Sequence, residues 1–258
     1  LYRSIQTLVK GQGLRIISHG MQPALSVSVP AQMPWSIGDY LLPWRWIGAA
    51  EDQRDQRLAG LTIVCISDTH GQHRRLTMPP GDILVHAGDY TRFGSRQDAV
   101  DFNAWLGDLP YRHKIVVQGN HEYNADWKAE ADQILSNARL LHHEPILIDG
   151  VRVFGSNFFW KCSGPNPYYD QIPAESDIVL AHQPAHGHAD LGRGCPSFLD
   201  RIRNIRPRLV VSGHLHDGPG VQFGGGALRG IVFVNAACAD GHHQITKDLV
   251  VVRFPREA

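Results

Sequence analysis

Five short apolar segments of this chain are each followed directly by residue types that bind metal ions. The segments are rich in Val, Ile and Leu, which is typical of strands buried on both faces of a parallel sheet. In α/β sheets, ligand-binding residues gather at the carboxyl ends of such strands. We therefore expect one site, built by the residues that follow segments 61–67, 83–87, 114–118, 178–181 and 209–212: Asp68 with His70, Asp89, Asn120, His182, and His214 with His216.

The rest of the chain predicts further strands and helices around these segments. Asp149-Gly150 lies between two apolar runs, 146–148 and 151–154, and predicts a two-residue hairpin. Strands and helices alternate at first and strands dominate later, so we expect an α/β fold with a mixed sheet or two packed sheets. Helices are expected at 95–106, 126–138 and 197–205, and closing strands at 231–234 and 249–254.

Residues 1–60 differ in composition from the remainder. Four prolines between positions 23 and 43 break any long helix, and three tryptophans between 35 and 46 are too apolar to stay in water. We expect an N-terminal extension, residues 1–60, that packs on a main domain, residues 61–258. A substrate-covering or oligomer-forming arm is the alternative, and the oligomeric state stays open.

Charge and cysteine usage narrow the classes of partner and compartment. Formal net charge is zero, so no general nucleic-acid surface or acidic-membrane surface is expected. No run of about 18 apolar residues predicts a membrane span, and the first residues lack the pattern of a signal peptide. The four cysteines are widely spaced and contain no Cys-x-x-Cys, which disfavours a zinc ribbon. A cytoplasmic protein is the expectation, with disulfide pairing left open.

The ligand set itself indicates which ions it suits. Seven nitrogen and oxygen ligands are too many for one four-coordinate zinc and fit two ions that share a bridge. Carboxylate, amide and imidazole without thiolate favour Mn, Fe, Zn or Co, and we expect Mn to serve best in vitro. Asp68 and Asp89 offset only part of the charge of two dications, and the remainder would attract a phosphate and a hydroxide.

The ordered blocks Asp-x-His, Gly-Asp, Gly-Asn-His-Glu, His and Gly-His-x-His resemble those of the calcineurin-like metallophosphoesterase superfamily. The sequence segments 63–70, 80–89, 206–214 and 234–237 are similar to those of one branch, the metallophosphoesterase-domain-containing (MPPED) group. The resemblance implies a sandwich of two mixed β-sheets flanked by helices. It also implies a dinuclear site and phosphodiesterase activity on small or cyclic-nucleotide esters, with a small-molecule phosphoester as the partner.

The resemblance assigns a role to each position. His121 would be the catalytic residue, facing the substrate and either protonating the leaving oxygen or stabilising charge in the transition state. Arg92, three residues after Asp89, is a candidate contact for a second phosphate oxygen or a solvated loop residue. The metal roles are divided as follows: Asp68, His70 and His216 for the first ion, Asn120, His182 and His214 for the second, and Asp89 as the bridge.

Two departures from the family pattern and several alternatives remain. Gln183-Pro184-Ala185 follows His182 where Gly-Pro-Pro is expected, which puts the substrate-side loop in question, and Glu122 replaces the more usual Asp. A phosphomonoesterase, a non-catalytic scaffold on the same fold and a nuclease are the alternative functions. The pairs His142-His143 and His242-His243 are expected at the surface, although one of the latter pair could approach the site in the last long loop.

Overall fold

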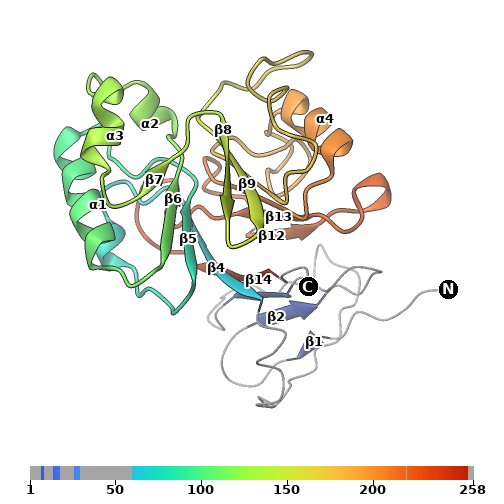
Figure 1. Ribbon diagram of the computed structural model, residues 1–258, viewed down its shortest axis with the longest axis horizontal. Coiled ribbons are helices and arrows are strands. Elements are labelled where there is room, and N and C mark those ends of the chain that lie inside the picture. The colour runs from blue at the N-terminus through green and yellow to red at the C-terminus, as the bar shows by residue number, and fades with distance from the viewer. Residues whose placement is uncertain (1–6, 9–13, 18–25, 30–59, 219, 255–258) are drawn as a thin grey trace.

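The computed structural model describes residues 7–8, 14–17, 26–29, 60–218 and 220–254, and their strands form two sheets (Figure 1). The first sheet has the order β1 (Thr7–Leu8), β2 (Leu14–Ile17), β3 (Ser26–Val29), β14 (Val250–Phe254), β4 (Leu61–Ile66), β5 (Ile83–His86), β6 (His113–Val116), β7 (Arg139–Leu140). The second has the order β12 (Val221–Phe223), β13 (Val232–Asn235), β11 (Leu209–Ser212), β10 (Ile178–Ala181), β9 (Val151–Ser156), β8 (Glu144–Ile148). Both sheets are mixed, as the resemblance predicts.

The strands that precede the candidate ligands run parallel within each sheet. In the first sheet β4, β5, β6 and β7 are parallel neighbours. In the second, β9, β10, β11 and β13 are parallel neighbours. A parallel bridge between Ser67, after β4, and Ala237, after β13, joins the two sets. The carboxyl ends of both parallel sets therefore meet at one edge of the sandwich.

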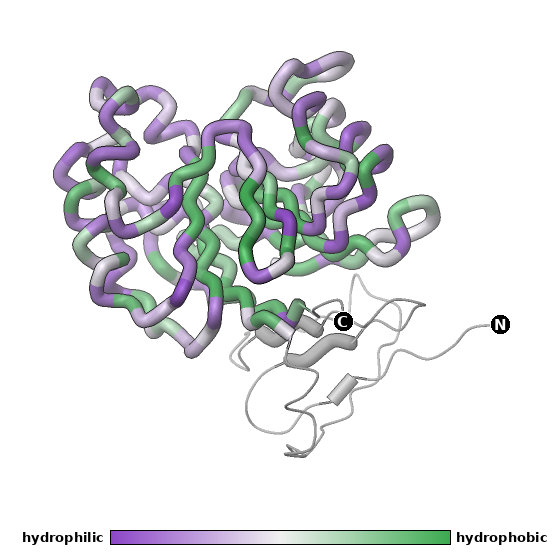
Figure 2. The backbone as a smooth tube through the Cα atoms, viewed as in Figure 1, coloured by the Kyte–Doolittle hydropathy of each residue, from purple (hydrophilic) through white to green (hydrophobic). Residues whose placement is uncertain are grey.

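The core is layered around the two sheets. Apolar side chains from the facing sides of both sheets, such as Ile63, Val85, Leu180 and Val211, form one buried cluster between them. Figure 1 shows helix α1 (Arg96–Asp108) outside the first sheet and α4 (Pro196–Ile205) outside the second. Each helix packs its apolar side on the outer face of its sheet. Figure 2 shows the strands as the hydrophobic centre between more hydrophilic outer segments.

Two local predictions are confirmed in detail. The Ser95 hydroxyl accepts a hydrogen bond from the Asp98 N–H at 3.2 Å and caps α1. Asp149 and Gly150, with φ values of 50° and 84°, join antiparallel β8 and β9. Positive φ at both turn positions matches the twist of the flanking strands, which is why Asp-Gly predicts such a hairpin.

The predicted continuous helix at 126–138 is wrong. This stretch contains a 3-10 turn (Lys128–Glu130) and the single-turn helix α3 (Ala131–Ile134). Asn137 accounts for the early end, because it bonds to Asn103 of α1 through its backbone N–H (2.8 Å) and its side-chain amide (2.9 Å). Such side-chain bonds compete with helix continuation. Two further short elements, α2 (Asn120–Tyr123) and β12, were not predicted.

Only part of the expected N-terminal extension lies within the described residues. There, β3 pairs antiparallel with β14, so the segment Ser26–Val29 continues the first sheet beyond its C-terminal strand. The tryptophans between positions 35 and 46 lie outside the described residues. The division at residue 60 stays a prediction.

Within the part of the chain that the structure describes, no helix combines the length and the apolar character that a membrane crossing requires.

Candidate metal centre

One cluster of ligand atoms forms where β5, β6, β10 and β11 end. The Asn120 side-chain oxygen lies 3.1 Å from His182 Nε2 and 2.9 Å from His214 Nδ1. His182 Nε2 also lies 3.4 Å from Asp89 Oδ2. The other nitrogen of His182, Nδ1, donates to the Ala87 carbonyl at 2.7 Å, which turns Nε2 toward the cluster. Ligand-type atoms of four side chains thus converge at one point.

A second cluster forms where β4 and β11 end. His70 Nε2 and His216 Nε2 are 3.2 Å apart, and His216 Nε2 is also 3.2 Å from Asp68 Oδ1. His216 Nδ1 donates to the Asp240 carbonyl at 2.7 Å, and His70 Nδ1 faces the Thr91 carbonyl at 3.4 Å. Metal-binding histidines usually orient their rings through such bonds from the second nitrogen.

These distances suit ions better than direct bonds between the side chains. Two nitrogens bound to one ion at about 2.0–2.1 Å are roughly 2.8–3.4 Å apart for right-angled to tetrahedral geometry. The 3.2 Å separation of His70 and His216 falls in that range. Because both Nδ1 atoms are turned to carbonyls, the lone pairs of both Nε2 atoms share one space, which a cation or a proton must occupy.

Asp89 belongs to both sides of the site. Its carboxylate lies within 4.8 Å of the ligand atoms of His182 and His214 on one side, and of His70 and His121 on the other. The side chain is 2% exposed, so its charge requires compensation from within the protein or from bound cations. This position fits the bridging role that the resemblance implies.

The backbone is held in an unusual conformation at four of the candidate ligands. Asp68, His70, Asp89 and His214 have φ values of 53°, 43°, 56° and 66°. Each non-glycine residue in this left-handed region costs on the order of 1–3 kcal/mol and persists only where its surroundings enforce it. Here the Asp68 and His70 N–H groups donate to the carbonyls of Gly88 (2.9 Å) and Asp89 (3.1 Å). Strain of this kind concentrates at functional sites.

Glycine at position 213 allows the two sheets to approach each other closely. A Cβ atom built there would lie 2.7 Å from Ser67 Cβ and still nearer to Ser67 Oγ and Asp68 Oδ2. The next residue, His214, donates its N–H to Asp68 Oδ1 at 3.1 Å and Oδ2 at 2.9 Å. The absence of a side chain at Gly213 thus lets a ligand-bearing loop reach the Asp68 carboxylate.

The charges of the site compensate one another. Burial acts to raise the pKa of Asp68, but the hydrogen bond from His216 and the nearby His182 outweigh it and hold that pKa below its usual range. Burial likewise opposes ionisation of His182, yet its attraction to Asp89 raises its pKa to about 9. Burial lowers the pKa of both His70 and His214 to about 4, which keeps each ring neutral at neutral pH, with one nitrogen free to act as a ligand.

Glu122, in the first turn of α2, supports the backbone next to the candidate ligands, as expected for a residue behind the ligands at a helix N-terminus. Its buried carboxylate accepts 2.9 Å bonds from the N–H groups of Asp89, Thr91 and Gly119, and a 2.6 Å bond from the Thr91 hydroxyl. Burial, then the charge of Asp89, raises the pKa of Glu122 to about 7, while the bonds from Thr91 and Gly119 oppose the rise. Three of the four partners are N–H groups, so the arrangement fits the carboxylate form.

His121 and Arg92 lie at the open side of the clusters. The N–H of His121 donates to Asp89 Oδ1 at 2.9 Å, and its Nε2 lies 3.8 Å from Asp89 Oδ2. Its ring stacks on the exposed ring of Phe93 at 5.2 Å. Arg92 is exposed on the same loop, and its backbone N–H donates to Asp98. The substrate role of both residues remains a prediction.

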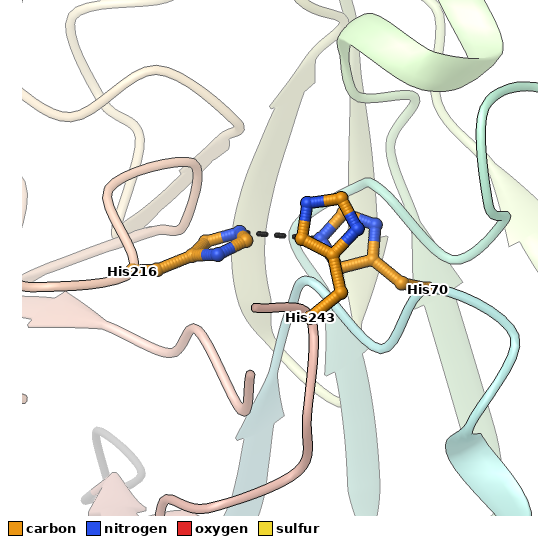
Figure 3. Close-up of side chains that lie close together, drawn as sticks. All are labelled: His70, His216 and His243. Carbon is orange, nitrogen blue, oxygen red and sulfur yellow. Dashed lines mark hydrogen bonds between the residues drawn. The ribbon is translucent and has the colours of Figure 1, made fainter. Parts of the chain in front are cut away.

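His243 is a member of the site that the sequence analysis did not select. One of its ring nitrogens lies within 4.8 Å of one ring nitrogen each of His70 and His216, and the three side chains face one another in Figure 3. It follows no strand-to-glycine pattern, and the only sequence signal was its place in the last long loop. By contrast, His186 lies beside Asp190, and His188 stacks on Phe233 in the loop after His182.

The fold and the site together define a two-sheet α/β sandwich with clustered imidazole and carboxylate ligands at one edge, a class of metal-dependent hydrolases. A family model described as calcineurin-like phosphoesterase matches residues 61–218. The chain belongs to this family, whose members are phosphoester hydrolases that use divalent metal ions.

Individual relatives agree with this assignment. The chain is 32% identical over 234 residues to human metallophosphoesterase domain-containing protein 1, covering 75% of this chain and 71% of that protein. It is also 32% identical over 225 residues to UPF0046 protein K07C11.7 of Caenorhabditis elegans, covering 76% of each. These relatives confirm the resemblance to the MPPED branch. The crystal structure of phosphopantetheinyl hydrolase (PptH) from Mycobacterium tuberculosis shares the fold, with a TM-score of 0.52 and 13% identity over 72% of this chain and 92% of that one.

Proposed function

We propose that this protein is a dinuclear metal-dependent phosphodiesterase that hydrolyses small or cyclic-nucleotide phosphodiesters with a metal-activated water. The observation that carries the proposal is the position of Asp89, whose one carboxylate lies between two sets of ligand-type atoms. Two ions bridged by a carboxylate can hold both oxygens involved in a displacement at phosphorus. A phosphomonoesterase on the same residues is the alternative.

The ligand assignment follows the two clusters. Asp68, His70 and His216 would hold the first ion, and Asn120, His182 and His214 the second, with Asp89 shared. The donors are nitrogen and oxygen atoms only, which supports Mn, Fe, Zn or Co rather than a thiolate-bound metal. When bound, two such ions supply Lewis acidity at the phosphoryl group and make water a nucleophile at neutral pH.

His121 is proposed to deliver the proton to the leaving oxygen. Its Nδ1 lies 3.0 Å from both the Thr91 carbonyl and the Phe93 N–H. When Nδ1 accepts the Phe93 N–H, the neutral ring carries its proton on Nε2. That hydrogen points toward Asp89 and the space above it, where a leaving oxygen would lie.

Exposed aromatic side chains flank the clusters and support an organic ester as the substrate. Phe93, 76% exposed, stacks on His121 on one side. On the other side Trp160, 61% exposed, packs edge-on against Phe158, which contacts the ring of His214 at 5.4 Å. Large exposed rings are costly in water and commonly mark binding surfaces. A flat group such as a nucleobase could stack there.

Unpaired cysteines support the proposed cytoplasmic location. All four cysteines are free, and three of them, Cys65, Cys195 and Cys238, are buried. The sulfurs of Cys162 and Cys195 lie 3.7 Å apart, a contact rather than a covalent bond. A reducing compartment keeps such thiols unpaired.

The decisive assay measures hydrolysis of bis-p-nitrophenyl phosphate with Mn by the wild-type protein and by Asp89→Ala and His121→Ala. We expect a loss of at least about a hundredfold in both variants, since general acid catalysis alone contributes roughly 10²–10⁴-fold. Matched controls are Asp200→Ala and His113→Ala, which remove the same residue types outside the clusters. Equal rates of hydrolysis in all five proteins would contradict the proposal.

Two further outcomes separate the alternatives. A panel of p-nitrophenyl phosphate, the linear diester and 3′,5′- and 2′,3′-cyclic nucleotides distinguishes a monoesterase from a diesterase by kcat/KM. Metal analysis of the folded protein identifies a scaffold, because a decayed site would hold no metal even at saturating Mn.

A further inference from the structure

We propose that His243 is a substrate-binding residue, which donates a hydrogen bond to a phosphoryl oxygen of an ester bound at the Asp68–His70–His216 cluster. The inference rests on the proposed phosphoesterase function and deepens it. It adds a second histidine to the substrate side of the site, across the open face from His121, whose ring centroid is 5.8 Å away.

The ring of His243 covers the Asp68–His70–His216 cluster. It stacks on His70 with 4.1 Å between ring centroids and 11° between the planes, and it lies 5.5 Å from His216 at 69°. In Figure 3 His243 comes from the loop before β14, while His70 and His216 come from the ends of β4 and β11. Three segments far apart in the sequence therefore place their rings around one small space.

The stacking excludes His243 as a further ligand of the ion that His70 would hold. An imidazole nitrogen binds an ion that lies in the plane of its ring. Two nearly parallel rings 4.1 Å apart have separate planes, because coplanar rings at that distance would overlap. An ion in the plane of His70 is thus well out of the plane of His243. The ring of His243 therefore covers His70 without sharing the position of that ion.

Hydrogen bonding also distinguishes the two candidate ligands, His70 and His216, from His243. His70 and His216 each turn one nitrogen to a backbone carbonyl, as metal ligands commonly do. Within the described part of the chain, neither ring nitrogen of His243 has a hydrogen-bond partner. A half-buried imidazole with both nitrogens unused can donate to a bound anion without breaking a contact in the protein.

The loop holds His243 in place through its backbone. The N–H groups of His242 and Gln244 donate to Asp240 Oδ1 at 2.9 and 3.0 Å. The Asp240 carbonyl accepts both the His243 N–H at 2.9 Å and His216 Nδ1 at 2.7 Å. His243 itself has a φ of 58°, a left-handed conformation that such a network must maintain. The loop that orients a candidate ligand thus also positions His243.

The test compares His243→Gly with His243→Asn. Both residues tolerate a positive φ, so the loop keeps its backbone conformation, and only Asn retains a side-chain donor. The adjacent, exposed His242 provides the matched control, His242→Gly. Calorimetry measures the affinity of the Mn-loaded proteins for inorganic phosphate, elemental analysis measures bound Mn, and kinetics measure kcat and KM for bis-p-nitrophenyl phosphate.

We expect full Mn content in all variants and phosphate affinity about 10- to 100-fold weaker in His243→Gly, which is the range for one hydrogen bond to a charged group. His243→Asn should recover part of this loss, and His242→Gly should match the wild type. Loss of Mn from His243→Gly would make His243 a ligand and overturn the inference. Unchanged phosphate affinity in that variant, or no phosphate binding by the wild type, would also overturn it.

The inference and the proposed function fail in different ways. A wild-type protein that binds phosphate through His243 but hydrolyses no ester contradicts the proposed function and leaves the phosphate contact standing. A wild-type protein that hydrolyses diesters, with His243→Gly equal to it in kcat/KM and phosphate affinity, contradicts only the inference.

Discussion

A single methyl group at Gly119 is expected to disable the site. Gly119 precedes Asn120 and has a φ of −90° and a ψ of −169°, which any residue adopts, so Gly119→Ala carries no backbone penalty of its own. The effect must come from contact. The new Cβ would lie 2.5 Å from the backbone nitrogen of Asp89 and 2.8 Å from its Cγ, and closer still to Oδ1.

The size of the effect follows from those distances. Cβ atoms essentially never approach other atoms within 3.0 Å, so Asp89 must move by at least about 0.5 Å relative to Gly119. The backbone of Asp89 cannot rotate away, because its N–H is bonded to buried Glu122 at 2.9 Å. Overpacking of this kind typically costs about 1–3 kcal/mol of stability. A displacement approaching 1 Å of a group at the reacting centre is expected to cost roughly a hundredfold in rate.

The assay measures three properties of Gly119→Ala: the free energy of unfolding, the Mn content and kcat/KM for bis-p-nitrophenyl phosphate. Gly225→Ala is the control, since a Cβ there meets nothing within 4 Å and φ is −103°. We expect the control to match the wild type in all three properties. A Gly119→Ala protein with wild-type Mn content and full activity would refute the reasoning that Asp89 has no room to move.

Three other predictions concern removal of the metal, the effect of acid on stability and the exposed side chain of Trp160. Chelation should lower the unfolding temperature and added Mn should restore it, because an ion at 100 times its Kd stabilises the fold by about 2.7 kcal/mol; an unchanged temperature argues against bound metal. Burial lowers the pKa of His86 to about 3, so the unfolded chain takes up its proton first. The stabilising contribution of neutral His86 is present above about pH 6.5 and is lost as pH falls toward 3, about 2 kcal/mol by pH 5. Between pH 7.5 and pH 5, the free energy of unfolding measured with denaturant should therefore fall less in His86→Gln than in the wild type. Equal decreases would contradict the lowered pKa of His86. Trp160→Ala should raise KM for aromatic esters about 5- to 100-fold with little change in kcat, as stacking energies imply, while exposed Leu147→Ala should change neither; a purely kcat effect would exclude stacking.

The candidate ligands were predictable because strand ends carry them. Each buried strand is recognisable by its run of β-branched and aliphatic residues, and the polar residue that stops the run must face the sheet edge. The Asp149-Gly150 hairpin and the Ser95 cap were predictable for a similar reason, since both depend on bonds within a few residues. Family resemblance added the division of the ligands between two ions, which the spacing alone does not contain.

The continuous helix expected at 126–138 does not form, because hydrogen bonds between residues far apart in the sequence compete with it. Periodicity of its apolar residues favoured one helix, but Trp127 donates to the Gly94 carbonyl at 2.6 Å and Asn137 bonds to Asn103. Both partners lie more than 30 positions away, and tertiary bonds of this range have no local signal. The hydrogen-bond partners of Glu122 also had no local signal, because the backbone N–H groups that donate to it lie after the end of a neighbouring strand.

The sequence predicts which side chains are candidates for the chemistry and that they follow parallel strands at one edge. How these side chains meet depends on the packing of the whole fold. His70 and His216 are 146 positions apart and face each other across 3.2 Å because the two sheets join after β4 and β13. His243 enters the same space from a loop without any motif, held by Asp240 rather than by a strand. Strand propensity is local and readable along the chain, whereas the approach of a loop to a site depends on packing between distant segments.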